Sequence, residues 1–221
     1  MPIRPLALAL ALALSFSSGA NPTQAQAQTL ETMRLAQAGN HAYEGGDHAT
    51  AARYFEVAGR RGNRLAQFNL AMMLYRGETQ SDNGNAMWQW LRRAAQAGLP
   101  QAQFNFALLY DHGDHVARSF TTAAEWYRRA AAQGHMEAQV SLATLYFLGQ
   151  GVPQDYAQAA YWYRAAANAG DVGSQYLIGH MYEQGYGVTQ DTRLARHWYL
   201  QAALQGDRGA QAKYDALRDA P

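Results

Sequence analysis

Apolar and polar positions along this chain repeat with a period of 36 residues. The pattern is clearest over residues 138–170, where an apolar stretch ends at Gly149 and a second, aromatic stretch ends at Gly170. The same positions recur in both directions, in one column of Gly62, Gly98, Gly134, Gly170 and Gly206 and another of Tyr54, Trp90, Trp126, Trp162 and Trp198. A fixed period of this length is typical of a solenoid, in which each repeat buries its apolar face against its neighbours.

Each repeat divides into two helices, helix A and helix B. Helix A is expected over residues 64–76, 100–112, 136–148 and 172–184, and a glycine follows each one, since glycine readily adopts the left-handed conformation that ends a helix. Helix B is expected over residues 84–97, 120–133, 156–169 and 192–205, each after a favoured N-cap residue, Asn83, Ser119, Asp155 or Asp191. A looser pair is expected over residues 30–44 and 48–61, after a polar spacer over residues 23–29.

The stretch A-Q-x-x-L-A-x-L-Y-x-x-G-x-G-V-x-x-D-x-x-x-A-x-x-W-Y-x-x-A-A-x-x-G, residues 138–170, resembles the Sel1-like repeat family, a relative of the tetratricopeptide repeats. The next repeat keeps its Gly185, Gly187, Val188, Asp191, Trp198 and Tyr199. Two loops depart from the pattern, because Gln80 replaces the valine of one and His115 replaces the second glycine of another. The resemblance implies an all-α, right-handed solenoid of antiparallel helix pairs that binds proteins or peptides.

The period also predicts the domain organisation. Residues 1–27 are expected to be a signal peptide and the start of the spacer, and residues 28–62 a tetratricopeptide-like helix pair. Four repeats follow over 63–98, 99–134, 135–170 and 171–206. Residues 207–221 are expected to form a C-terminal capping helix, because their outer side is polar and solenoids need such an end.

The candidate partner-binding residues lie on helix A, which lines the concave side of tetratricopeptide-type stacks. Transferring the concave positions onto the 36-residue register gives four columns: Phe68, Phe104, Val140 and Tyr176; Met72, Leu108, Thr144 and His180; Tyr75, Asp111, Phe147 and Glu183; and Arg76, His112, Leu148 and Gln184. This apolar and aromatic mixture with charges at its edges is typical of an interaction patch. The first column is equally compatible with packing between neighbouring helices A. The Trp column of helix B, beside alanine pairs, is expected to lie in the core.

An alternative chemistry is a metal site at Asp111, His112, Asp114 and His115, where two carboxylates and two imidazoles fall within five residues. Ligands so close in sequence rarely converge on one ion, so we predict no metal and no cofactor. We also predict no catalytic residue, because the chain has no cysteine, no recognisable serine nucleophile motif and no phosphate-binding glycine loop between a strand and a helix. The protein is therefore not expected to be an enzyme.

The net charge bears on the class of partner, and the first residues bear on the cellular location. The formal net charge of +1 gives no electrostatic reason to expect nucleic acid as a partner. Arg4 precedes an apolar run over residues 6–16 and then small residues, a pattern typical of a secretory signal peptide cleaved near Ala20 or Ala27. A bilayer span needs about 20 apolar residues, so the run is too short for one. The absence of cysteine excludes a lipoprotein anchor.

These observations predict an exported, periplasmic interaction module that binds a protein or peptide in its concave groove, as an envelope adaptor or regulator. The alternative is a structural scaffold that makes its contacts through its convex face or its ends. An enzyme or a metal-binding protein ranks third. The sequence names neither the partner nor the oligomeric state.

Overall fold

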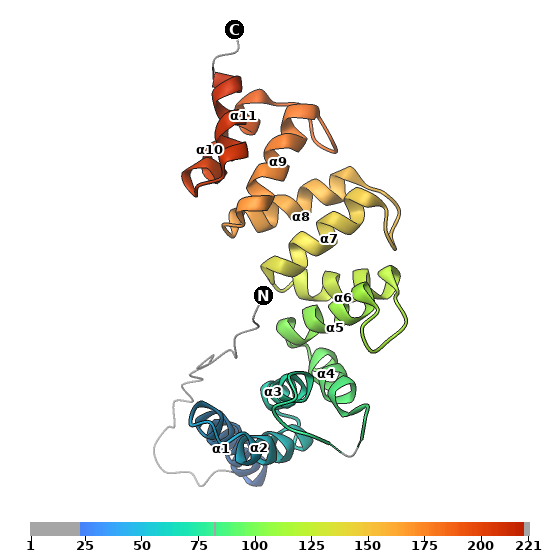
Figure 1. Cartoon of the computed structure of the whole chain (residues 1–221), viewed down its shortest axis with the longest axis vertical. Coiled ribbons are helices and arrows are strands. Elements are labelled where there is room, and N and C mark those ends of the chain that lie inside the picture. The colour runs from blue at the N-terminus through green and yellow to red at the C-terminus, as the bar shows by residue number, and fades with distance from the viewer. Residues whose placement is uncertain (1–22, 82, 219–221) are drawn as a thin grey trace. The chain divides into compact units, whose positions relative to one another are not determined.

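A computed structural model describes residues 23–81 and 83–218, and within these ranges it contains only helices and the loops between them (Figure 1). The all-α architecture of helix pairs is thereby confirmed. The helices are α1 (Gln24–Glu44), α2 (His48–Arg60), α3 (Arg64–Tyr75), α4 (Ala86–Gln96), α5 (Pro100–His112), α6 (Phe120–Ala131), α7 (Met136–Leu148), α8 (Tyr156–Asn168), α9 (Val172–Gln184), α10 (Thr192–Leu204) and α11 (Arg208–Arg218). None of the helices within these ranges is both long and apolar enough to cross a bilayer.

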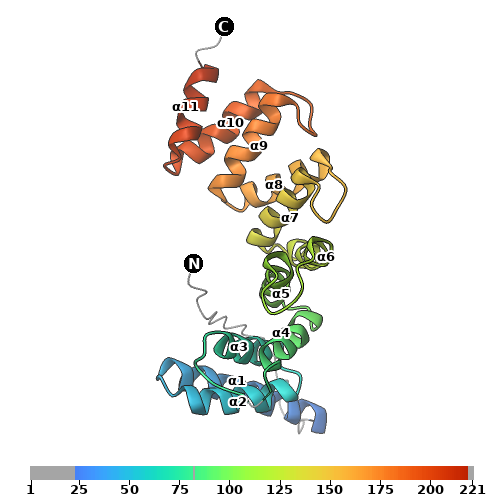
Figure 2. The same ribbon diagram turned by 45° about the vertical axis from the view of Figure 1, so that its right-hand side comes forward.

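The helices fall into two compact units, residues 1–99 and 100–221. In the first unit α1 packs on α2, α2 on α3 and α3 on α4. In the second, α5 to α11 form one continuous succession in which each helix packs on the next, from α5 in green to α11 in red (Figures 1 and 2). Helices A (α5, α7, α9) alternate with helices B (α6, α8, α10), and α11 occupies the place of a further helix A.

The helix ends match the sequence prediction to within two residues from α3 to α10. Ser119, Asp155 and Asp191 each accept a hydrogen bond from a backbone N–H of the first turn of helix B, as expected of N-caps. The prediction for Asn83 was wrong, because α4 starts after Asn85, whose side chain makes no capping bond. Asn83 instead accepts a bond from the Asn85 N–H at 3.0 Å.

The polar spacer predicted over residues 23–29 is instead helical from Gln24 onward, with Thr23 as its N-cap. Thr23 and Gln26 form a capping box, in which the Gln26 N–H donates to Thr23 Oγ1 (3.3 Å) and the Thr23 N–H donates to Gln26 Oε1 (2.7 Å). These two bonds satisfy backbone N–H donors at the start of α1. The helix therefore begins at Gln24, before the apolar pattern that starts near Leu30. Residues 1–22, where most of the predicted signal peptide falls, lie outside the described residues.

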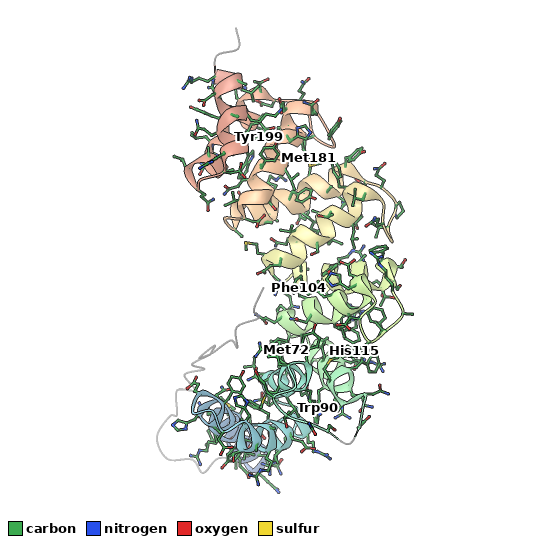
Figure 3. All side chains as sticks on the ribbon, in the orientation of Figure 1. Met72, Trp90, Phe104, His115, Met181 and Tyr199 are labelled. Atoms are coloured by element: carbon green, nitrogen blue, oxygen red, sulfur yellow. The ribbon has the colours of Figure 1, made fainter. Side chains whose placement is uncertain are left out.

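The fully buried aromatic residues of the second unit form a tyrosine column, and the tryptophans predicted to lie in the core pack against the same apolar clusters. Tyr127, Tyr163 and Tyr199 are between 0% and 4% exposed, whereas the tryptophans that precede them are only half-buried. Small neighbours make room for the tyrosine rings: a Cβ on Gly179 would lie 3.1 Å from the Tyr199 ring. Tyr199 of α10 and Met181 of α9 belong to one apolar cluster and are labelled in Figure 3. In the first unit Trp90 is buried, as predicted, and Leu91 takes the tyrosine position.

A column of buried glutamines links successive helix pairs. Gln67, Gln139 and Gln175 of helix A donate to the carbonyls of Gly59, Ala131 and Ala167 near the end of the preceding helix B, at 2.9, 3.2 and 3.2 Å. Each of these carbonyls also accepts the backbone N–H of the glycine three residues later, at 3.0 Å, so the amide supplies a second hydrogen bond to a carbonyl at the end of helix B.

The second loop glycine sets how closely each A–B loop approaches the preceding pair. Gly151 and Gly187 have φ angles of +69° and +68°. A Cβ added to Gly187 would lie 2.1 Å from the Tyr156 carbonyl carbon, and one on Gly151 would lie 2.3 Å from that of Phe120. At the same loop position His115 keeps a left-handed φ of +58°, although it is not a glycine.

Candidate functional site

The candidate site with accessible side chains lies on α5, α7 and α9 of the second unit. We call it the A-helix face, defined by Phe104, Leu108, Val140, Phe147, Tyr176 and His180. The five apolar members each pack on the core with one side and keep part of their surface exposed. Phe104, labelled in Figure 3, stacks on the His135 imidazole with ring centroids 4.7 Å apart. The face is therefore an apolar surface whose side chains are held by packing rather than free to move.

Buried tyrosine hydroxyls hold the polar groups of this face. Tyr127 donates to Asp111 Oδ2 at 2.8 Å, and Tyr199 donates to Glu183 Oε2 at 2.7 Å. In the repeat between them Phe147 occupies the carboxylate position, and the Tyr163 hydroxyl pairs with Thr144 at 2.9 Å instead. Burial and the neighbouring carboxylates raise the pKa of Tyr127 and Tyr199 well above its usual range, so both hydroxyls keep their protons.

Glu183 is the most highly connected charged group of the face. Lys213 Nζ of α11 lies 3.0 Å from both carboxylate oxygens, and His180 Nδ1 lies 3.5 Å from Oε2. Burial alone would raise the pKa of Glu183, but the hydrogen bonds from Tyr199 and Lys213 and the lysine charge outweigh it and lower the pKa. Glu183 is therefore an ionised, fixed acceptor that joins α9, α10 and α11.

An aromatic chain borders the face at its loop end. The Phe147 ring lies 5.1 Å from that of Tyr156, which stacks on Tyr186 at 5.5 Å. Tyr186 in turn meets His180 edge to face at 6.0 Å. Leu148, at the end of α7, is 52% exposed. The apolar surface thus continues from helix A onto the adjoining loops of the same unit.

The four groove residues predicted in the first unit do not form an exposed apolar face like that of the second unit. Phe68 and Met72 are only 4% and 6% exposed, so they are interior side chains, in agreement with the packing alternative for the Phe68 column. α1 packs against this stretch of α3, where Asn40 Oδ1 accepts from Asn69 Nδ2 at 3.1 Å. Arg76 donates to the Tyr43 hydroxyl at 3.1 Å, so this guanidinium supports α1. Tyr75 keeps a half-exposed ring.

The alternative metal site does not assemble. Asp111 points its carboxylate at the Tyr127 hydroxyl, and His115 lies in the α5–α6 loop with Nε2 3.5 Å from Asp114 Oδ1. His112 is exposed on the last turn of α5. Across the part of the chain that the structure describes, no group of three or more His, Cys, Asp or Glu side chains could hold a metal ion.

Sequence reasoning missed the tyrosines and Lys213 as parts of the site. The signal was present, since a tyrosine follows each tryptophan in the last three repeats and Lys213 is the single lysine of the chain. What could not be foreseen was that each hydroxyl reaches a helix A side chain 16 or 19 residues earlier.

Comparison with known proteins identifies the repeat family that this sequence matches. The model of the Sel1 repeat matches residues 64–99, 100–135, 137–171 and 172–207. A protective antigen of uropathogenic Escherichia coli with an SLR fold, c5321, is 32% identical with a TM-score of 0.77, over 86% of this chain and 41% of that protein. A Sel1 repeat protein from Oxalobacter formigenes is also 32% identical, with a TM-score of 0.75, over 81% of this chain and 74% of that one. The chain thus spans less than half the length of the E. coli protein.

No curated protein matches the chain significantly. The matched repeats cover more than half of the sequence, and their boundaries coincide with the helix pairs α3–α4, α5–α6, α7–α8 and α9–α10. Sel1 repeat proteins generally mediate protein–protein interactions. The chain belongs to the Sel1 repeat family.

Proposed function

We propose that this protein is an exported interaction module whose A-helix face binds a segment of another protein or a peptide. The observation that carries the proposal is the partly exposed apolar surface made by Phe104, Leu108, Val140, Phe147 and Tyr176 on three successive helices A. A few buried residues, aromatic ones prominent among them, supply most of the affinity in protein interfaces. The partner would be an extended or helical segment that buries its own apolar side chains there.

The fixed polar groups favour recognition by the same face. Asp111 and Glu183 are oriented by buried tyrosines, and Glu183 is ionised at neutral pH because its pKa is lowered. A preorganised acceptor loses little side-chain entropy when a partner donates to it. The carboxylates would therefore set the direction of the bound segment, while the apolar centre supplies affinity. Because no chemistry is needed for this role, the proposal includes no catalytic residue and no cofactor.

Export is proposed from residues 1–27, whose single arginine, apolar run and small residues are typical of a secretory signal peptide. The sequence contains no cysteine to which a lipid could be attached after the signal. A periplasmic adaptor or regulator is the role that agrees with both features. Alkaline phosphatase fused after residue 28 would be active in the periplasm if the segment directs export, and inactive if it does not.

A structural scaffold is the second candidate, favoured by exposed apolar side chains on helices B. Tyr161, Leu194 and Leu204 are 53%, 40% and 73% exposed, and they lie on α8 and α10 rather than on the A-helix face. A scaffold that makes its contacts through this side would depend on these three residues and not on the A-helix face.

One pair of variants separates the two functions. The first changes Leu108, Phe147 and Leu148 to serine, and its control changes Tyr161, Leu194 and Leu204 to serine. Partner capture from envelope extract by the mature chain, read by quantitative mass spectrometry, should fall at least tenfold for the first variant and stay unchanged for the control. Helical circular dichroism must be retained by both. The reverse pattern would support the scaffold and contradict groove binding.

A further inference from the structure

A cavity of about 380 Å³ lies in the first unit between α2, α3, α4 and the α3–α4 loop. Its apolar lining is built from Ala52, Leu70, Leu74 and Trp90, the last of which is labelled in Figure 3. Arg53 and Glu56 of α2 and Thr79, Gln80 and Ser81 of the loop supply polar groups. The volume falls in the range of small-molecule sites, which combine an apolar lining with a few polar groups.

The loops of the second unit indicate why this space is open. There Gly151 and Gly187 lie against the backbone at the start of the preceding helix B, and the valines that follow, Val152 and Val188, pack on the apolar clusters. Two repeats before Gly151 and Val152, the α3–α4 loop carries Thr79 and Gln80. A side chain at residue 79 hinders the same close approach, and burying the Gln80 amide without partners would cost free energy. The loop therefore leaves the space that the valine fills elsewhere.

The two charged side chains at this cavity, Glu56 and Arg53, differ in how much of their hydrogen-bonding capacity is already used. Glu56 is already paired with Arg60, whose Nη2 and Nε lie 2.7 and 3.2 Å from Oε1. Arg53 makes a long bond of 3.4 Å from Nη2 to Thr50 Oγ1. A guanidinium has five N–H donors, so Arg53 can still bind an anion, and a carboxylate matches its planar fork.

We propose that this cavity binds a small aliphatic carboxylate. The hydrocarbon chain would lie against Leu70, Leu74 and Trp90, and the carboxylate would accept hydrogen bonds from Arg53. Two sources present this chemistry, a free short-chain fatty acid and the C-terminal leucine, isoleucine or valine of a peptide. The site belongs to the first unit and is independent of the A-helix face.

Isothermal titration of the full chain with hexanoate and, separately, with N-acetyl-leucine tests the proposal. At least one of the two should bind saturably, hexanoate identifying the free acid and N-acetyl-leucine the peptide C-terminus. Hexan-1-ol, which lacks the charge, should bind at least about tenfold more weakly than hexanoate, since a hydrogen bond to a charged group contributes roughly a factor of ten or more. Absence of saturable binding by both carboxylates, or equal binding of the alcohol, would overturn the proposal.

Three variants locate the site. Arg53→Gln, at an exposed position, should weaken carboxylate binding about tenfold or more. Arg61→Gln, at the C-cap of the same helix and paired with Glu31 outside the cavity, is the matched control and should leave binding unchanged. The double change Thr79→Gly with Gln80→Val gives this loop the Gly-Val pair of the later repeats and should abolish binding while helical circular dichroism is retained. Carboxylate binding that survives both Arg53→Gln and this double change lies elsewhere on the protein and contradicts the assignment.

Discussion

The hydroxyl of Tyr199 on α10 donates a 2.7 Å hydrogen bond to Glu183 Oε2 on α9, and Lys213 of α11 binds the same carboxylate. One buried tyrosine thereby fixes an ionised group at the edge of the A-helix face and, through it, the last helix. The hydroxyl of the corresponding Tyr163 shares a 2.9 Å hydrogen bond with the neutral hydroxyl of Thr144. The two repeats therefore offer a charged and an uncharged version of one contact.

Tyr199→Phe should destabilise the fold more than Tyr163→Phe. Losing a hydrogen bond to an ionised group costs about 1.5–3 kcal/mol, against about 0.5–1.5 kcal/mol for a neutral pair. Because the pKa of Glu183 is lowered in the folded state, the stability it contributes is present above about pH 4.5 and is lost as the pH falls through the folded pKa. Urea unfolding at pH 7 and pH 3 measures both effects. Equal losses for the two variants at pH 7 would show that the carboxylate adds nothing.

Tyr163→Ala should cost more stability than Trp162→Ala, although tryptophan is the larger residue. Removing a buried aromatic side chain typically costs about 3–5 kcal/mol, and Tyr163 is the buried member of this pair. Trp162 keeps part of its ring in solvent, so its removal leaves a smaller cavity. Thermal and urea unfolding of both variants give the comparison. A larger loss for Trp162→Ala would restore the tryptophan column as the principal core.

Gly187→Ala should destabilise the protein by about 1–3 kcal/mol more than Gly206→Ala, the range expected for overpacking. Both glycines have a positive φ, so both variants carry the cost of a left-handed alanine. Only at Gly187 would the new Cβ meet backbone, 2.1 Å from the Tyr156 carbonyl carbon, whereas at Gly206 nothing lies within 4 Å. The difference between the two free energies of unfolding isolates the steric contact, and a difference near zero would show that the loop moves freely.

Ala169→Gln should stabilise the fold. In two repeats a glutamine after helix B donates to the Oε1 of a buried helix A glutamine: Gln133 to Gln103 at 2.7 Å, and Gln205 to Gln175 at 2.8 Å. In the repeat between them the donor position is Ala169, and Oε1 of the buried Gln139 has no hydrogen bond. Supplying the donor should gain about 0.5–1.5 kcal/mol. Ala169→Met, of similar length but without a donor, controls for added apolar area. A gain of the same size with methionine would exclude the hydrogen bond as its cause.

His135 should make stability depend on pH near neutrality. It caps α7 by accepting from the Ala138 N–H at 3.4 Å, and burial lowers its pKa while Glu137 acts weakly in the opposite direction. The neutral form is favoured on folding, so this stability is present above about pH 6.5 and is lost as the pH falls through the folded pKa. His135→Asn retains a capping oxygen and removes the titration. Unfolding free energies at pH 7.5 and 5 should fall less for the variant than for the wild type, and parallel losses would contradict this role.

Helix positions were predictable because helices depend on neighbours in the sequence. Asp155 and Asp191 start helices B, and Gly149 and Gly185 end helices A, through hydrogen bonds and φ angles within a few residues. The 36-residue period then required each helix to pack on the next, and the family resemblance supplied the helix A positions to test. The alternation of helix pairs therefore followed from the sequence by itself.

What the sequence could not determine was how far each helix is rotated and what covers it. Trp162 and Tyr163 are adjacent and both aromatic, yet about 100° of rotation separates them on an α-helix, and packing against α7 and α9 buries the tyrosine. Phe68 and Phe104 occupy the same register position, but only Phe104 keeps an accessible ring. Local hydrogen bonds gave the helices their ends, whereas long-range packing decided which of their side chains remain available to a partner.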